Sequence, residues 1–297
     1  MRANEKTAAY VSQMEAALDE AVRLDASLRQ ADVVQAMRYS LLGGGKRIRA
    51  QLVLGFCEGL GGDIRAALPA AVAVEMVHAY SLIHDDLPCM DDDDMRRGRP
   101  SCHIAFCESL ALLAGDALLT RAFEVLSGAD NIAIIGSQAV VSQLQVLAQA
   151  AGTDGMVGGQ VTDVEPAVGG RSLADLEYTN QLKTGALIRA AARMGCIAAG
   201  ADNRTQILAS EYAGLIGLGF QVVDDILDVY GDADAMGKKV GRDQKQNKTT
   251  YLTLLGREEA QNSADELHQQ ALLKLNQLTL RDSFLHDLTE MLANRTR

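Results

Sequence analysis

Apolar residues recur at spacings of three and four along most of this 297-residue chain, and this pattern limits its fold more than any other feature. In residues 5–30, Val11, Met14, Leu18 and Val22 follow the spacing of one helical face. Strict apolar–polar alternation is scarce and Asn-Gly hairpin turns are absent, so few strands are expected. Similar spacing or long Ala/Leu/Met-rich runs cover residues 108–126, 131–151, 173–200, 204–230 and 263–292.

The breaks between these segments are short and contain no linker or internal repeat, which predicts one all-α domain over residues 1–297. Because the predicted helices are apolar over much of their circumference, we expect a layered bundle with buried central helices. Residues 66–84 contain Glu75, His78 and His84 and therefore fit a core helix better than a membrane span. Gly and Asp clusters mark the breaks near 43–45, 61–63, 152–159, 166–170 and 231–237.

Composition excludes several classes of protein. With 48% hydrophobic and 23% charged residues the chain is not of a disordered type, and a net charge of −11 argues against a nucleic-acid binder. The odd number of cysteines, five, and the lack of a signal-peptide apolar block predict a cytoplasmic protein without stable membrane insertion. Cys102, His103 and Cys107 lie close enough in sequence to suggest a zinc site. No second ligand pair follows, so buried or inert thiols are favoured.

The first acidic cluster comprises Asp85, Asp86 and Asp91–Asp94, directly after an apolar helical run. Two unit charges about 4 Å apart cost roughly 4 kcal/mol at an effective dielectric near 20, so such a cluster lies in open water, raises some pKa values or holds cations. A solvated acidic loop is the simpler interpretation. The position at the end of an apolar helix favours a site instead, and Pro88 allows the chain to fold back so that Asp91 approaches the same ligand.

The second cluster, Asp224, Asp225 and Asp228, lies within an otherwise apolar predicted helix. Asp224 and Asp228 are four residues apart and project from one face. Carboxylates without His or Cys are hard oxygen ligands suited to Mg²⁺, which takes one or two carboxylates per ion together with water and phosphate oxygens. The two clusters together predict a multi-metal clamp for a diphosphate.

Basic residues beside glycine and aspartate complete this pattern. Lys46, Arg47 and Arg49 follow three glycines, which let the backbone approach a ligand, and Arg96 and Arg97 follow the first acidic cluster. The spacing is not that of a P-loop. Phosphate contact is the better interpretation for Lys46, Arg49, Arg96 and Arg97. A surface position remains open for the other lysines: Lys183, Lys238, Lys239, Lys245 and Lys248.

Together these segments resemble the trans-isoprenyl diphosphate synthases, most closely the bacterial short-chain farnesyl diphosphate synthases. The resemblance runs from about residue 35 to 256 and rests on GGGKRIR, VHAYSLIHDDLPCMDDDDMRRGRP, GDALLTRAFEVL, KTGALI, GFQVVDDILD and GKKVGRDQKQNKTTY. It implies a single polyprenyl synthase domain of antiparallel helices around a deep central cavity, and a homodimer.

The resemblance also implies roles for individual residues. Three Mg²⁺ ions on the allylic diphosphate are expected at Asp85, Asp86, Asp91, Asp224, Asp225 and Asp228. Contacts to that diphosphate are expected from Arg96, Lys183 and Lys238, and these three complete the catalytic set with Asp85, Asp86, Asp91, Asp224 and Asp225. The isopentenyl diphosphate pocket corresponds to Lys46, Arg49, His78 and Arg97. Thr184 and Gln221 match polar residues near the reacting carbons, and Asp243 and Lys248 match a closing loop.

The implied reaction joins isopentenyl diphosphate to dimethylallyl or geranyl diphosphate through an allylic carbocation. Tyr80, five residues before Asp85, is expected to limit the product to fifteen carbons, although Ser81 shares the face of Asp85 better. A twenty-carbon product is the alternative. Proline is common in the family at positions 50 and 252, where this chain has Ala50 and Leu252, which concerns local rigidity rather than catalysis.

Other functions fit less well. A class I terpene cyclase would usually carry an Asn/Ser/Glu-type second metal motif and would need no isopentenyl pocket. A non-catalytic synthase subunit tends to lose one aspartate motif, whereas both are present here. A helical scaffold without an active site does not explain why the acidic runs lie beside Arg96 and Arg97.

Overall fold

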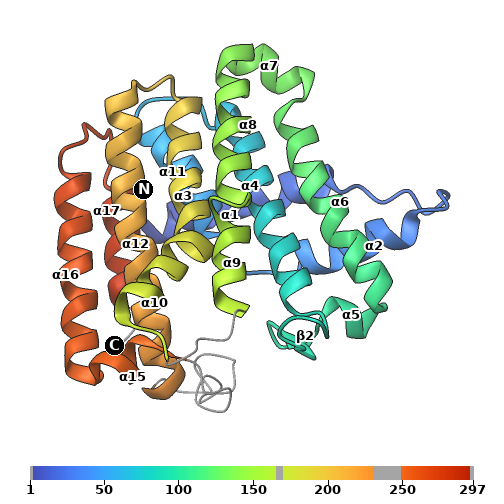
Figure 1. The fold of residues 1–297 in the computed structure, drawn as a ribbon. Helices are drawn as coiled ribbons and strands as arrows, with labels where there is room; N and C mark the ends of the chain where they lie inside the picture. The colour runs from blue at the N-terminus through green and yellow to red at the C-terminus, as the bar shows by residue number, and fades with distance from the viewer. Residues whose placement is uncertain (1–2, 165–169, 231–248, 295–297) are drawn as a thin grey trace.

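A computed structural model of the chain describes residues 3–164, 170–230 and 249–294 (Figure 1). It is an all-α bundle with one short hairpin of antiparallel strands, β1 (Met95–Arg96) and β2 (Arg99–Pro100), which confirms the predicted fold class. The helices are α1 (Ala3–Ala21), α2 (Ala31–Leu41), α3 (Ile48–Gly59), α4 (Ile64–Asp85), α5 (Cys102–Ala105), α6 (Glu108–Leu126), α7 (Ala129–Ile135), α8 (Ser137–Ala151), α9 (Met156–Val164), α10 (Leu173–Asn180), the π-helical turn η1 (Gln181–Gly185), α11 (Ala186–Ala198), α12 (Asn203–Tyr230), α15 (Tyr251–Leu255), α16 (Arg257–Leu275) and α17 (Phe284–Ala293).

Helices α3, α4 and α11 form the centre of the bundle (Figure 1). Their side chains are apolar over most of the circumference, and Phe56, Met76 and Met194 are fully buried. The backbones of α3 and α11 approach closely at Gly195, where a Cβ atom would lie 2.3 Å from the carbonyl oxygen of Val53. This small residue lets the central helices pack without a gap.

Helix α4 occupies the predicted range 66–84 and supports the interpretation as a core helix. By length and composition it is the one described helix that could cross a membrane, or one of up to two if the bent pair Ala129–Ile135 and Ser137–Val164 is counted as a span. Of its most apolar window, 72% is buried inside the protein. The core, not a bilayer, takes up its apolar surface.

Several predicted helices differ from the observed ones for identifiable reasons. The segment 5–30 is helical only to Ala21, where Arg38 and Arg121 donate to the carbonyl groups of Val22 and Ala21. Gly136, with φ of 84°, separates α7 from α8 within 131–151. The segment 173–200 contains η1, and turns at 276–283 divide 263–292 between α16 and α17. The ranges 108–126 and 204–230 agree with α6 and α12.

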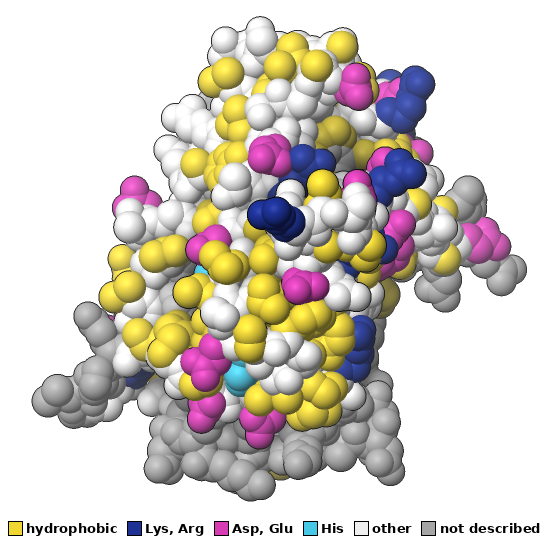
Figure 2. Space-filling model, turned by 90° about the vertical axis from the view of Figure 1, so that its right-hand side faces the viewer, with side chains coloured by type: hydrophobic (Ala, Val, Ile, Leu, Met, Phe, Trp, Pro, Cys, Tyr) yellow, Lys and Arg dark blue, Asp and Glu magenta, His cyan; other side chains and the backbone are white. Residues whose placement is uncertain are grey.

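Apolar side chains also gather on one outer face. Figure 2 shows this face from the side of α5, α6 and α7, where Ile104, Leu112, Leu113 and Ile134 are between 47% and 52% exposed. A patch of large apolar residues at this degree of exposure is typical of a surface that contacts another protein.

Candidate active site

The first acidic cluster begins where α4 ends. Asp85 is the last helical residue, and after Pro88 the chain turns back, so that the Asp91 amide donates to the Asp85 carbonyl oxygen at 2.8 Å. The Asp93 amide likewise donates to the Asp86 carbonyl oxygen at 3.2 Å. The structure therefore brings Asp91 back to Asp85, as the position of Pro88 predicts.

The Asp85 carboxyl group lies in an unusual electrostatic setting. Burial first, and then the neighbouring charges of Asp91 and Asp86, raise its pKa from 3.8 to about 6, although the charges of Lys183 and Arg96 act in the opposite sense. Burial and the nearby negative charges make the charged form of this carboxyl group costly in free energy. A bound cation would offset that cost, so the site favours cation binding.

Asp86 makes a different set of contacts. It is 2% exposed, and Arg96 Nε donates to both of its carboxylate oxygens, at 3.1 and 3.2 Å. Arg96 Nη2 also donates to Asp86 Oδ1 and lies 3.5 Å from Asp93. Arg96 comes from strand β1, so this ion pair fastens the hairpin to the end of α4. The predicted metal ligand and the predicted phosphate contact are partners of each other here.

Lys183 reaches the same region from the π-helical turn η1. Its Nζ atom donates to Asp163 Oδ2 at 2.6 Å, and its charge acts on Asp85. Helix α9 passes close by, since a Cβ atom on Gly159 would lie 2.1 Å from the Lys183 amide nitrogen. A π-turn widens a helix by one residue per turn and often occurs at functional sites. Here it carries Lys183 and its neighbour Thr184.

The second acidic cluster lies near the end of α12. Val222, Val223 and Ile226 are buried in a small core that includes Tyr251, while Asp224 and Asp228 are half-buried. Asp225 Oδ2 accepts a hydrogen bond of 2.8 Å from the Tyr251 amide at the start of α15. Asp225 thus ties α12 to the helix that follows in the described chain.

The two acidic helices end toward the same side of the molecule. Figure 1 shows the carboxyl ends of α4 and α12 directed toward the same lower end of the bundle. The turn η1 joins them: Lys183 interacts with Asp85, and a Cβ atom on Gly217 of α12 would lie 3.4 Å from the Cα atom of Gly185. The turn η1 therefore lies between the end of α4 and α12, which it contacts at Gly217, two turns before Asp224.

Within the described residues no three His, Cys, Asp or Glu side chains gather closely enough to hold a metal ion by themselves. Mg²⁺ does not require such a cage, because it commonly takes one or two carboxylates and completes its octahedron with water and substrate phosphate oxygens. The paired backbones of Asp85 and Asp91, and the raised pKa of Asp85, fit this type of site.

A second, cationic cluster lies two turns earlier on α4. Burial, together with the charges of Arg49 and Arg97 and other arginines, lowers the pKa of His78 well below 6.5, so this imidazole is neutral near pH 7. Arg49 Nε is buried and has no hydrogen-bond partner among the residues described. Unsatisfied buried donors are rare in native proteins and indicate a ligand or water at this position.

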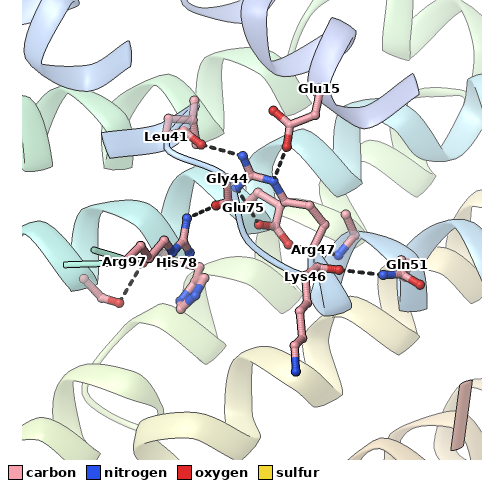
Figure 3. A network of polar contacts seen from close by, with 11 residues as sticks. Glu15, Leu41, Gly44, Lys46, Arg47, Gln51, Glu75, His78 and Arg97 are labelled. Atoms are coloured by element: carbon pink, nitrogen blue, oxygen red, sulfur yellow. Dashed lines mark hydrogen bonds and ion pairs between the residues drawn. The ribbon is translucent and has the colours of Figure 1, made fainter. Parts of the chain in front are cut away.

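The glycine-rich loop brings the other side of this cationic cluster into place. Gly44 and Gly45 have φ values of 83° and 132°, which favour glycine, and a Cβ atom on Gly45 would lie 3.0 Å from the Arg97 guanidinium. Arg97 donates to the Gly44 carbonyl oxygen. Lys46 extends from the loop away from Arg47 (Figure 3). Lys46 thus comes from this loop, Arg49 from the first turn of α3, His78 from α4 and Arg97 from the turn between β1 and β2.

The remaining predicted residues divide into three groups. Tyr80 is 7% exposed, with its ring edge-on to His84 at 5.7 Å, and Ser81 Oγ donates to the His78 carbonyl oxygen at 3.0 Å. Gln221 is half-buried on α12, one turn before Asp225. Three further predictions lie outside the described residues: Lys238, Asp243 and Lys248.

The residues raised for zinc do not converge. Cys102 is buried and burial raises its thiol pKa, Cys107 is exposed beside the Ser109 hydroxyl, and His103 Nδ1 lies 3.1 Å from Ser101 Oγ. Each of the three therefore has a separate local partner or environment.

Sequence reasoning did not find Asp163, Glu15 or Glu75. Asp163 pairs with Lys183 and Arg171, and Glu75 is a buried carboxylate in the middle of α4. For Glu75 the signal was present, since a charged residue inside an apolar run needs a partner. For Asp163 and Glu15 no local pattern identifies the partner.

Comparison with known proteins gives consistent matches. Residues 30–280 match the family described as polyprenyl synthetase. The chain is 46% identical to the farnesyl diphosphate synthase of Escherichia coli over 269 residues, 89% of this chain and 90% of that protein. It is 45% identical over 258 residues to the heterodimeric geranylgeranyl pyrophosphate synthase large subunit 1, chloroplastic, of Arabidopsis thaliana, 86% of this chain and 69% of that protein. A solved FPP/GFPP synthase from Zymomonas mobilis superposes with a TM-score of 0.86 at 34% identity, covering 99% of each chain.

Proposed function

This chain belongs to the polyprenyl synthetase family and is a trans-prenyltransferase of isoprenoid biosynthesis, and we propose that it condenses isopentenyl diphosphate with dimethylallyl and geranyl diphosphate to give farnesyl diphosphate. One observation carries this proposal: a cationic pocket and an acidic pocket lie along the same helix. His78 and Asp85 are seven residues apart on α4, which is two turns on one face and about 10 Å along the axis. Two diphosphate substrates, one held by arginines and one through metal ions, fit this arrangement.

We propose that Mg²⁺ is the metal, as the carboxylate-only donor set suggests, and that three ions bind, as the family resemblance implies. Asp85, Asp86 and Asp91 would hold it from the α4 side, and Asp224, Asp225 and Asp228 from α12. When bound, Mg²⁺ supplies positive charge to the leaving diphosphate oxygens. A carboxylate has lone pairs for a metal besides those that accept hydrogen bonds, so Asp86 and Asp225 would hold Mg²⁺ beside their contacts with Arg96 and the Tyr251 amide.

The chain's own cations complete the leaving-group site. Arg96 and Lys183, both within electrostatic range of Asp85, donate to the allylic diphosphate and stabilise its negative charge as the C–O bond breaks. Lys238 is proposed to add to this set. Thr184 and Gln221 lie on η1 and α12 and are proposed to face the reacting carbons, and the family resemblance assigns a closing loop to Asp243 and Lys248, which lie outside the described residues.

The second diphosphate belongs in the pocket of Lys46, Arg49, His78 and Arg97. Arg49 Nε, buried without a protein partner in the described structure, would donate to it, and neutral His78 can donate a hydrogen bond without adding charge. The isopentenyl double bond then attacks the allylic cation, and a proton passes to the released diphosphate. The apolar side chains of the pocket would keep water from the cation.

Product length follows from the side chain that closes the pocket. Tyr80 is almost fully buried five residues before Asp85, where a growing chain would pass along α4. A bulky ring at this depth favours fifteen carbons over twenty. The twenty-carbon product remains the second candidate, because farnesyl and geranylgeranyl synthases match this chain at similar identity.

We further propose a cytoplasmic homodimer of one polyprenyl synthase domain, residues 1–297, assembled through the apolar face of Leu112, Leu113 and Ile134. Light scattering after size-exclusion chromatography should give twice the mass of 31.7 kDa. Leu113→Glu should give the monomer mass if this face is the interface.

The product proposal is tested by incubating the protein with Mg²⁺, isopentenyl diphosphate and one primer at a time. We expect elongation of dimethylallyl and geranyl diphosphate, with farnesyl diphosphate as the end product. Efficient extension of farnesyl diphosphate would favour the twenty-carbon alternative, and a cyclic hydrocarbon product would replace the proposal with a cyclase.

A further inference from the structure

Arg47 lies within the glycine-rich cationic loop, but its side chain does not point to the proposed diphosphate. It is 4% exposed, and its backbone has φ of 50°, in the left-handed region, at the start of α3. A non-glycine residue keeps this conformation only when its surroundings hold it there. Figure 3 shows the guanidinium turned inward among carboxylates, with Lys46 pointing away from it.

The Arg47 guanidinium joins four helices. Nε donates to Glu15 Oε1 of α1 at 2.8 Å, Nη1 to Glu75 Oε2 of α4 at 3.3 Å, and Nη2 to the Leu41 carbonyl oxygen of α2 at 2.6 Å. Arg47 itself is the N-cap residue of α3. Only a guanidinium has donors in the forked arrangement that these partners require, and lysine would meet fewer of them.

Glu75 fastens the loop at a second point. It is 2% exposed, and its Oε1 atom accepts a hydrogen bond of 3.2 Å from the Ala50 amide. Proline, common in the family at this position, has no amide hydrogen, so this chain has an additional bond there. Arg49 lies between the two fastened residues, Arg47 and Ala50, and the Glu75 charge also favours its charged form against burial. The direction of Arg49 is therefore set by this network.

We propose that Arg47 is a positioning residue for the isopentenyl diphosphate pocket, and that Glu15 of the first helix controls the affinity of this pocket through Arg47. The proposal rests on the function proposed above. Arg47 and Glu15 touch neither substrate. They act by holding Arg49, together with the adjoining Lys46 and His78, in the arrangement that receives a diphosphate.

The decisive variant is Glu15→Gln, because Glu15 has 36% of its side chain exposed and the replacement keeps its shape. Its matched control is Asp19→Asn, one turn later on α1, which removes an ion pair with Arg38 that has no part in the loop. We expect Glu15→Gln to raise KM for isopentenyl diphosphate about fivefold, below the roughly 10²-fold effect of a 1 Å misplacement. KM for geranyl diphosphate should change by less than about twofold, and Asp19→Asn should leave both values within about twofold.

Arg47→Lys should act in the same direction and more strongly, with folding checked by thermal unfolding. Equal changes in both KM values, or the same effect from Asp19→Asn, would overturn the proposal in favour of a purely structural role. If the wild type forms no product, the proposed function fails by itself. The positioning role is then tested by calorimetry with inorganic diphosphate, where Glu15→Gln must weaken binding and Asp19→Asn must not.

Discussion

Arg96 Nε donates to both carboxylate oxygens of Asp86, at 3.1 and 3.2 Å, in a site where Asp86 is 2% exposed. The pair joins a residue proposed to bind metal to one proposed to bind the leaving diphosphate. A buried ion pair is costly to break on one side only, since it leaves an uncompensated charge. The two residues should therefore act as a unit.

A double-mutant cycle tests whether Asp86 and Arg96 act as a unit. Asp86→Asn and Arg96→Gln should each lower kcat/KM for geranyl diphosphate by about 10²-fold, and the double variant should lose little more than either single one. Steady-state kinetics of the three variants checks the prediction. Effects that multiply to about 10⁴-fold would show that Asp86 and Arg96 work independently.

Asp85 and Asp224 should contribute more to catalysis than the neighbouring acidic residues. Asp85→Ala and Asp224→Ala are each expected to lower kcat by about 10²-fold or more, because each removes charge stabilisation of the departing diphosphate. Asp94→Ala, an exposed aspartate from the same acidic run, is the control and should change kcat by less than about twofold. Equal losses in Asp85→Ala and Asp94→Ala would mean that only the total charge of the run matters.

The raised pKa of Asp85 predicts a stability effect in metal-free protein. The folded state keeps the Asp85 proton up to about pH 6, whereas the unfolded chain releases it near 3.8. Between these values the folded state binds more protons, so the free energy of unfolding falls as the pH rises. Asparagine at this position has no proton to release, so the free energy of unfolding of Asp85→Asn should not fall in this way.

Calorimetry in EDTA checks whether the charged Asp85 destabilises the folded protein. Tm of Asp85→Asn should exceed that of the wild type at pH 7.5, and the difference should vanish at or below pH 4. Added Mg²⁺ should raise Tm of the wild type more than that of the variant. A variant that is less stable at pH 7.5 would contradict the electrostatic description of Asp85.

Tyr80→Ala should lengthen the main product by about one five-carbon unit, since it removes a ring that is almost fully buried five residues before Asp85. Product chromatography with geranyl diphosphate as primer is the measurement. Ser81 lies next to it with its hydroxyl bonded to the His78 carbonyl oxygen. Lengthening by Ser81→Ala, with an unchanged profile for Tyr80→Ala, would transfer the role to Ser81.

The sequence predicted those features that depend on local pattern. Residues 108–126 and 204–230 form the expected helices, and Pro88 marks the reversal that returns Asp91 to Asp85. Helix α3 was not distinguished, because it is apolar almost all round and shows no amphipathic period. The family resemblance identified the motifs, and the match over residues 30–280 confirms the family.

Contacts between distant segments could not be predicted in this way. The Arg47–Glu15 and Lys183–Asp163 pairs join residues 32 and 20 positions apart, on separate helices. Nothing in the composition around Glu15 or Asp163 distinguishes them from surface acids. Likewise, the sequence around Lys183 has the apolar spacing of an ordinary helix and does not indicate the π-turn, which lies where Gly159 of α9 packs against it.

Transfer of label from isopentenyl diphosphate to geranyl diphosphate tests whether the two pockets on α4 serve one condensation. With radiolabelled isopentenyl diphosphate, geranyl diphosphate and Mg²⁺, we predict an acid-labile fifteen-carbon allylic diphosphate, and no product when EDTA removes the metal. Failure to transfer label to dimethylallyl, geranyl or farnesyl diphosphate in saturating Mg²⁺ would contradict the proposed function.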